Sequence, residues 1–183
     1  MDRRTLLAAG GAVALAAALP NAPARAASAA EIDEDARIAL RRLTDADPNA
    51  AELAKQAAAV LVFPHIVKAG VIVGGAYGEG ALMKGGATQG YFRSVAASYG
   101  LQLGAERFGY ALFFMSAEAL SYLDRSDGWE IGTGPTVVLV DEGFARKFSS
   151  TTLSQDVYAV FFNQEGFMAG LGIEGSKITR FDP

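Results

Sequence analysis

The chain offers few residues whose types and spacing could perform catalysis. His65 is the only histidine and cysteine is absent, which excludes thiol nucleophiles, disulfides, cysteine-based zinc sites and a His-rich metal cluster. A serine hydrolase triad would have to use His65, but the G-x-S-x-G sequence of a nucleophile elbow is missing. We therefore interpret His65 as a loop residue beside Pro64, and we predict no catalytic residue, no metal ligand and no cofactor.

Three glycine pairs, at positions 78/80, 132/134 and 170/172, have the G-x-G start of a nucleotide-binding loop. None continues to a third glycine at dinucleotide-loop spacing, and none precedes the Lys-Ser or Lys-Thr of a P-loop. Because all three lie in sequence typical of strands or turns, we interpret them as structural. The acidic run 33–35 lies at an expected helix start, where carboxylates interact favourably with the helix dipole. The sequence therefore favours a protein that is not an enzyme.

The densest basic group that could contact an anionic surface is Arg37, Arg41 and Arg42. These arginines border the apolar face of an expected helix, and we add the basic position Lys68 to complete a candidate lipid-binding set. A basic residue near an anionic membrane contributes roughly 1 kcal/mol, and salt weakens the attraction. An equally good interpretation is that the arginines pair with acidic residues of the same helix while its apolar face packs on a sheet.

The first 26 residues have the features of an export signal. Arg3 and Arg4 precede a weakly hydrophobic run, and residues 24–26 have the A-x-A form of a signal-peptidase site. The paired arginines resemble a twin-arginine signal; a Sec signal and an uncleaved anchor are the alternatives. We predict a signal peptide at 1–26 and one domain at 27–183, in the periplasm or secreted.

The charge of the mature chain limits its partners. The full sequence has 16 basic and 20 acidic residues, and cleavage after Ala26 would remove three basic residues and one acidic residue. The remaining 13 basic and 19 acidic residues give a formal charge of −6. A general nucleic-acid binder would have a basic excess, so nucleic acid is not an expected partner.

The elements expected to position these residues begin with two helices. Residues 28–31 form a capping-box sequence, and apolar residues recur on one face until the helix ends near residues 45–48. Asn49 is expected to cap a second helix. Residues 60–63 are typical of a short strand, which we expect Pro64 to stop.

From residue 70 onward, glycines interrupt apolar, strand-prone sequence. Glycine in a strand permits bends and close backbone approach. We predict that a side chain at Gly75 or Gly170 would collide with a neighbouring strand or force an unfavourable φ, so that valine at either position would lower stability. The later elements expected are strands at 91–103, 108–115 and 136–140, a hairpin turn at 84–87, a helix at 116–124, and a hairpin that joins 157–162 to 167–173 across 163–166. The predicted fold class is α+β, with two or three helices and an antiparallel, strongly bent, glycine-rich sheet that is either open or closed into a barrel.

Two stretches of the chain, 60–80 and 166–176, resemble a SYLF domain. The first reads Val-Leu-Val-Phe-Pro-His-Ile-Val-Lys-Ala-Gly and runs into Gly-Gly-Ala-Tyr-Gly-Glu-Gly; the second reads Gly-Phe-Met-Ala-Gly-Leu-Gly-Ile-Glu-Gly-Ser. Residues 100–106 and 111–115 fit the strands between them, so the resemblance covers roughly residues 50–180. Eukaryotic members bind phosphoinositide membranes and some bind actin, whereas bacterial members are mostly exported. The resemblance implies lipid binding through basic residues and an N-terminal amphipathic helix, and export makes actin an unexpected partner.

Two functions from different classes follow from the sequence. The first is a non-catalytic module of the bacterial cell envelope that binds phospholipid or a membrane surface. The alternative is an envelope scaffold whose partner is another protein, which the acidic net charge fits better. An enzyme ranks last because the catalytic motifs are missing.

Overall fold

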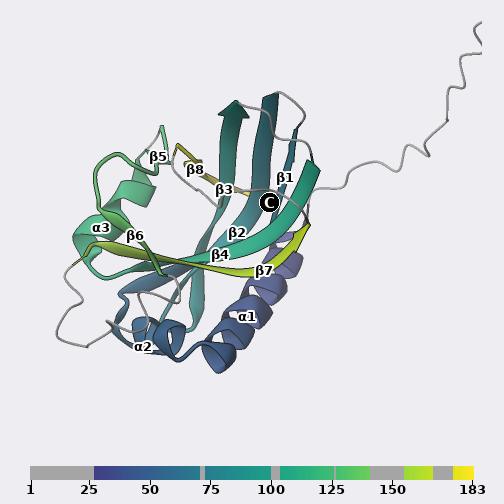
Figure 1. Cartoon of the computed structure of the whole chain (residues 1–183). Coiled ribbons are helices and arrows are strands. Elements are labelled where there is room, and N and C mark those ends of the chain that lie inside the picture. The colour runs from purple at the N-terminus through teal and green to yellow at the C-terminus, as the bar shows by residue number, and fades with distance from the viewer. Residues whose placement is uncertain (1–26, 71–72, 100–103, 126, 141–154, 167–174) are drawn as a thin grey trace, which may run out of the picture.

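The computed structural model describes residues 27–70, 73–99, 104–125, 127–140, 155–166 and 175–183. These residues form an α+β fold with three α-helices and one curled, half-barrel sheet of eight strands (Figure 1). The strand order is β5-β8-β3-β2-β1-β4-β7-β6, and all neighbours are antiparallel except β6 and β7. The elements are α1 (Ala29–Ala46), α2 (Pro48–Gln56), β1 (Ala59–Gly70), β2 (Val73–Lys84), β3 (Ala87–Tyr99), β4 (Gly104–Phe114), α3 (Ala117–Ser121), β5 (Trp129–Glu130), β6 (Val137–Val140), β7 (Val157–Gly166) and β8 (Lys177–Phe181).

The start of α1 confirms the predicted capping box. The backbone N–H of Glu31 donates to Ser28 Oγ, and the Glu31 carboxylate accepts from the Ser28 backbone N–H at 2.8 Å. The prediction that Asn49 caps the second helix is wrong. Asp47 is the cap, because its side chain accepts from the Asn49 N–H at 2.8 Å and Pro48 suits the first helical position, where no N–H is needed.

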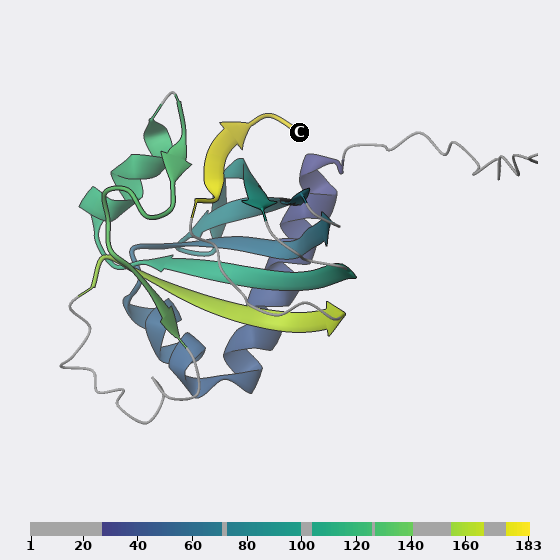
Figure 2. The ribbon, with the colours of Figure 1, turned by 45° about the horizontal axis from the view of Figure 1, so that its top comes forward.

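Helix α1 packs its apolar face on the sheet. Its buried residues are Ile32, Ala36, Ala39 and Leu43. They share a core with α2 and with the buried side chains on one face of β1, β2, β4 and β7. In Figure 2, α1 crosses one face of the sheet obliquely, and β4 and β7 extend past it. We call this the helix-covered face of the sheet. The opposite face carries a second, aromatic-rich core, which also packs against α3 and β5.

Strand β1 does not stop at Pro64, so that prediction is wrong. The register of β1 shifts by one residue between Val62 and His65 against β2, and between Phe63 and Ile66 against β4. One extra residue on β1 is a β-bulge, which is where a strand tolerates a proline without a backbone N–H. His65 is therefore a strand residue at this bulge and not a loop residue.

A second bulge lies in β7, where the sequence predicted a turn at 163–166. Those residues belong to the strand, because Glu165 pairs with Arg107 of β4. The register shifts beside Gly109, and Asn163 takes a positive φ of 51°. The expected partner strand at 167–173 lies outside the described residues. Bulges increase the local bend and twist of a sheet, so these two contribute to its curl.

Two other local predictions are confirmed, and one is wrong. Gly85 and Gly86 form the predicted hairpin turn with φ values of 58° and 81°, and the Ser116 side chain caps α3 at the Ala119 N–H, 3.1 Å away. At Gly75 neither predicted reason applies to an added Cβ, which would lie 3.4 Å from the Ala96 carbonyl oxygen, and φ there is not positive. Gly170 lies outside the described residues.

Candidate functional site

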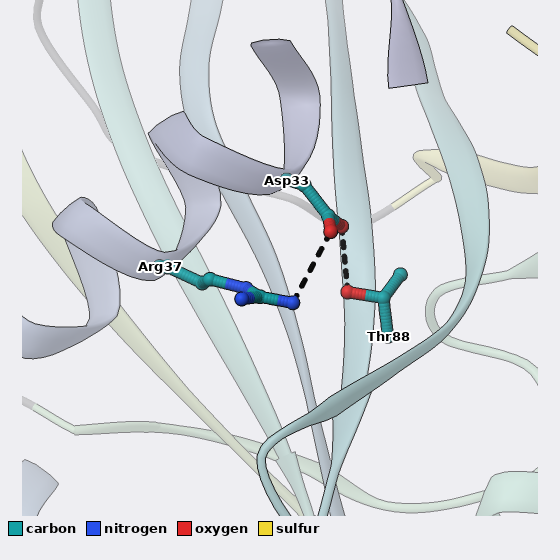
Figure 3. Close-up of polar contacts among 3 residues, drawn as sticks. All are labelled: Asp33, Arg37 and Thr88. Carbon is teal, nitrogen blue, oxygen red and sulfur yellow. Dashed lines mark hydrogen bonds and ion pairs between the residues drawn. The ribbon is translucent and has the colours of Figure 1, made fainter. Parts of the chain in front are cut away.

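Arg37 has a structural role in this fold. Its guanidinium lies 3.2 Å from Asp33 Oδ2, and Asp33 Oδ1 accepts a hydrogen bond from Thr88 Oγ1 at 2.6 Å (Figure 3). Asp33 therefore ties α1 to the start of β3 while Arg37 balances its charge. For this arginine, the interpretation of pairing within the helix is confirmed.

The apolar face of α1 is already occupied by protein. Ile32 and Leu43 keep 3% and 6% of their surface exposed, and Leu40 is partly buried in the same core. A membrane could reach this face only if α1 left the sheet. Contact through the docked helix is therefore restricted to its outward-facing side chains, which include Arg41 and Arg42.

The four residues of the candidate lipid-binding set do not come together. Arg37 lies at the β3 side of the sheet beside Thr88, and Arg41 is exposed. Lys68 lies in β1 opposite Glu106 of β4, and only 9% of its surface is exposed. Arg42 alone lines a hollow in the surface.

This hollow has a volume of about 420 Å³ and lies where α1, β1, β4 and β7 meet. Both bulges border it, since Pro64 and His65 come from the β1 bulge and Asn163 from the β7 bulge. The departures from regular strand register therefore shape it. Its lining residues are Arg42, Pro64, His65, Ile66, Val67, Arg107, Phe108, Asn163 and Glu165.

The polar groups of the hollow favour an anion. Arg42 and Arg107 bring two guanidinium groups from different elements, and Glu165 brings one carboxylate. The exposed His65 lies beside them, with Nε2 3.7 Å from Asp35 Oδ2. Guanidinium groups bind phosphate or carboxylate oxygens through paired hydrogen bonds. This arrangement can hold an anionic group, and no nucleophile paired with a base lies among the lining residues.

Arg107 is the functional candidate that sequence reasoning missed. It is separated from Arg42 by 65 positions in the chain, and only the register of β4 brings it to the hollow. Because the two bulges that border the hollow were not predicted, Arg107 and Arg42 could not be placed together from the sequence. The residues at 105–108, Ala-Glu-Arg-Phe, do not alternate between apolar and polar, so the local sequence carried no periodic signal that placed Arg107 on the surface.

Two other kinds of site are absent from the part of the chain that the structure describes. In those residues, no group of three or more His, Asp or Glu side chains is arranged to hold a metal ion. Among the described helices, none combines the length and apolar character needed to span a membrane.

Comparisons with known proteins do not identify the chain. No family model matches it, and no curated protein matches it significantly. The resemblance to SYLF domains therefore stays a prediction.

Proposed function

We propose that this chain is a non-catalytic module that binds anionic phospholipid at the surface of a bacterial envelope membrane, after export directed by residues 1–26. The observation that supports it best is the hollow, in which Arg42 and Arg107 come together beside an exposed part of the sheet. Two guanidinium groups suit the phosphate of a lipid headgroup. In this proposal Arg37 helps to hold α1 on the sheet, and neither Arg41 nor the largely buried Lys68 contacts a headgroup.

The bend of the sheet is part of this proposal. We propose that glycines in β2 permit the strand to approach the β1 bulge closely, and that this close approach shapes the neighbouring hollow. A Cβ at Gly78 would lie 2.5 Å from the carbonyl oxygen of His65, which itself lines the hollow. The resemblance to SYLF domains supports the same general role, because lipid binding is the property that it implies.

A protein-binding scaffold is the second candidate. The formal charge of −6 predicted for the mature chain favours it, since a strongly acidic protein is repelled by an anionic membrane except where a basic site faces it. The two candidates make opposite predictions about vesicles. A lipid-binding module sediments with anionic vesicles, and loss of its basic site weakens that binding, whereas a scaffold that binds only protein does not sediment with them.

Removal of both guanidinium groups from the hollow tests the proposal. We expect the double variant Arg42→Gln/Arg107→Gln to bind phosphatidylglycerol-containing vesicles about 10- to 30-fold more weakly than the unmodified protein, because each basic residue contributes roughly 1 kcal/mol. Arg41→Gln is the matched control, since Arg41 is exposed on the same helix but does not line the hollow. Equal binding by the folded double variant would contradict the proposed role of the hollow.

A further inference from the structure

We infer that His65 is the third cationic group of the hollow and that it makes anion binding depend on pH, so that the hollow holds an anion more tightly when the imidazole is protonated. The inference rests on the proposed function and adds the regulation of the same site. Arg42 and Arg107 carry a fixed charge, whereas the charge of a histidine changes with pH.

The β1 bulge brings the His65 side chain to the hollow. His65 lies in the stretch where the pairing of β1 shifts by one residue against β2 and against β4, and a bulge redirects the side chains that it carries. The next residue, Ile66, is buried in the aromatic-rich core, whereas the His65 side chain is 74% exposed and lines the hollow. The imidazole is therefore accessible both to solvent and to an anion in the hollow.

The ion pair between His65 and Asp35 is too weak to hold the imidazole. His65 Nε2 lies 3.7 Å from Asp35 Oδ2, which is longer than a hydrogen bond. The Asp35 side chain is itself 52% exposed, and exposed ion pairs contribute little. A protonated imidazole can therefore turn from Asp35 toward an anion that occupies the hollow.

Opposite charges balance around the hollow while the imidazole is neutral. Helix α1 brings Asp35 and Arg42, which are seven positions apart and so lie on the same side of the helix. The sheet brings Arg107 of β4 and Glu165 of β7, which pair in register. Two guanidinium groups thus face two carboxylates, and a proton on His65 gives this set a net positive charge.

Charged residues elsewhere on β1 and β2 do not change this balance. Glu79 of β2 is the register partner of His65, but its carboxylate is paired with Arg93 at 3.2 Å. On β1, Lys68 follows the buried Ile66 by two positions and so lies on the face opposite His65. The protonation state of His65 therefore decides the sign of the charge that an anion meets.

The expected change in affinity follows from the addition of one positive charge. The contribution of one basic group near an anionic surface corresponds to about fivefold in affinity. Because coupling between two binding events is reciprocal, a bound anion must favour the protonated imidazole by the same factor. Binding therefore strengthens as pH falls, and the anion moves the midpoint of the His65 titration to higher pH.

The composition of the chain makes this effect measurable. His65 is the only histidine, and histidine is the side chain that ordinarily changes its charge between about pH 5 and 8. The phosphodiester of phosphatidylglycerol keeps its charge over the same range. A change in binding within this range that disappears when His65 is replaced therefore reports the imidazole.

The test is sedimentation of the full mature chain with phosphatidylglycerol-containing vesicles at low salt, at about pH 5.5 and about pH 7.5. We expect the unmodified protein to bind about three- to fivefold more tightly at the lower pH. His65→Gln stays neutral and should bind weakly at both pH values, whereas His65→Lys keeps a positive charge and should bind tightly at both. Arg41→Gln is the matched control and should keep the pH dependence, because Arg41 does not line the hollow.

The outcomes separate this inference from the proposed function. Equal binding by the unmodified protein at both pH values would overturn the inference and leave the proposed function intact, and so would full pH dependence in His65→Gln. No binding at either pH would overturn the proposed function as well. A second measurement follows the imidazole NMR signal of the one histidine with and without soluble dihexanoyl phosphatidylglycerol. We expect the lipid to raise its titration midpoint by about 0.5–0.7 pH unit, and an unmoved midpoint while the lipid binds would contradict contact between His65 and the headgroup.

Discussion

Alanine at Gly78 or Gly80 is expected to destabilise the fold by pressing β2 against the β1 bulge. A Cβ at Gly78 would lie 2.5 Å from both the His65 carbonyl oxygen and Ile66 Cδ1. A Cβ at Gly80 would contact the Val62 carbonyl oxygen even more closely and would lie 2.7 Å from the Phe63 ring. Comfortable contact needs about 3.5–4.0 Å between carbon atoms, so the backbone of β1 would have to move by roughly 1 Å.

The expected cost follows from what that movement disturbs. Strand β1 is hydrogen-bonded to β2 on one side and to β4 on the other, and Phe63 is fully buried. Over-packing of such a site costs about 1–3 kcal/mol in free energy of unfolding. Neither glycine has a positive φ, so the penalty is steric and not conformational.

Gly75→Ala supplies the matched control in the same strand. Its Cβ would lie 3.4 Å from the Ala96 carbonyl oxygen, and replacing a strand glycine with alanine removes about 0.5–1 kcal/mol of backbone entropy cost. Urea unfolding of the three variants should therefore place Gly75→Ala at or above the parent midpoint and the other two clearly below it. Equal midpoints for all three would refute the close approach at the bulge.

Two further predictions concern groups that hold the fold together. Thr88→Val removes the 2.6 Å hydrogen bond to Asp33 and should lower the free energy of unfolding by about 1 kcal/mol; an unchanged urea midpoint would show that this contact does not anchor α1. Burial raises the pKa of Tyr110, whose hydroxyl donates to Ser94 Oγ at 2.7 Å. The neutral phenol therefore stabilises the fold fully below the unfolded pKa of about 10, and that contribution falls as pH rises toward the folded pKa, by up to about 1.4 kcal/mol per pH unit. Tyr110→Phe should flatten this alkaline loss in unfolding titrations, and an identical pH dependence would contradict the assignment.

Local signals in the sequence predicted two helix caps and one hairpin turn, because each of these features depends on residues only a few positions apart. The capping box at Ser28, the hairpin turn at Gly85 and Gly86, and the Ser116 cap each use side chains or backbone preferences within a few positions. The helix cap at Asp47 was missed by two residues. In that case the preference of Pro48 for the first helical position outweighs the capping ability of Asn49.

The bulges could not be predicted in the same way. Pro64 normally ends a strand, and residues 163–166 have turn-like composition, yet pairing with long neighbouring strands carries β1 and β7 through both segments. The strands that pair with β1 and β7 in these segments lie far away in the chain. Their hydrogen bonds and buried side chains therefore leave no signal in the local sequence. The hollow depends on both bulges, so its lining was predicted only at Arg42, while Arg107 became visible through the register of β4.

The most direct test of the proposed function is sedimentation of the unmodified mature protein with vesicles at several salt concentrations. The proposal predicts binding to vesicles that contain phosphatidylglycerol, little binding to phosphatidylcholine alone, and progressive loss as salt shortens the distance over which Arg42 and Arg107 act. No binding to the anionic vesicles at low salt, or equal binding to both compositions, would contradict it.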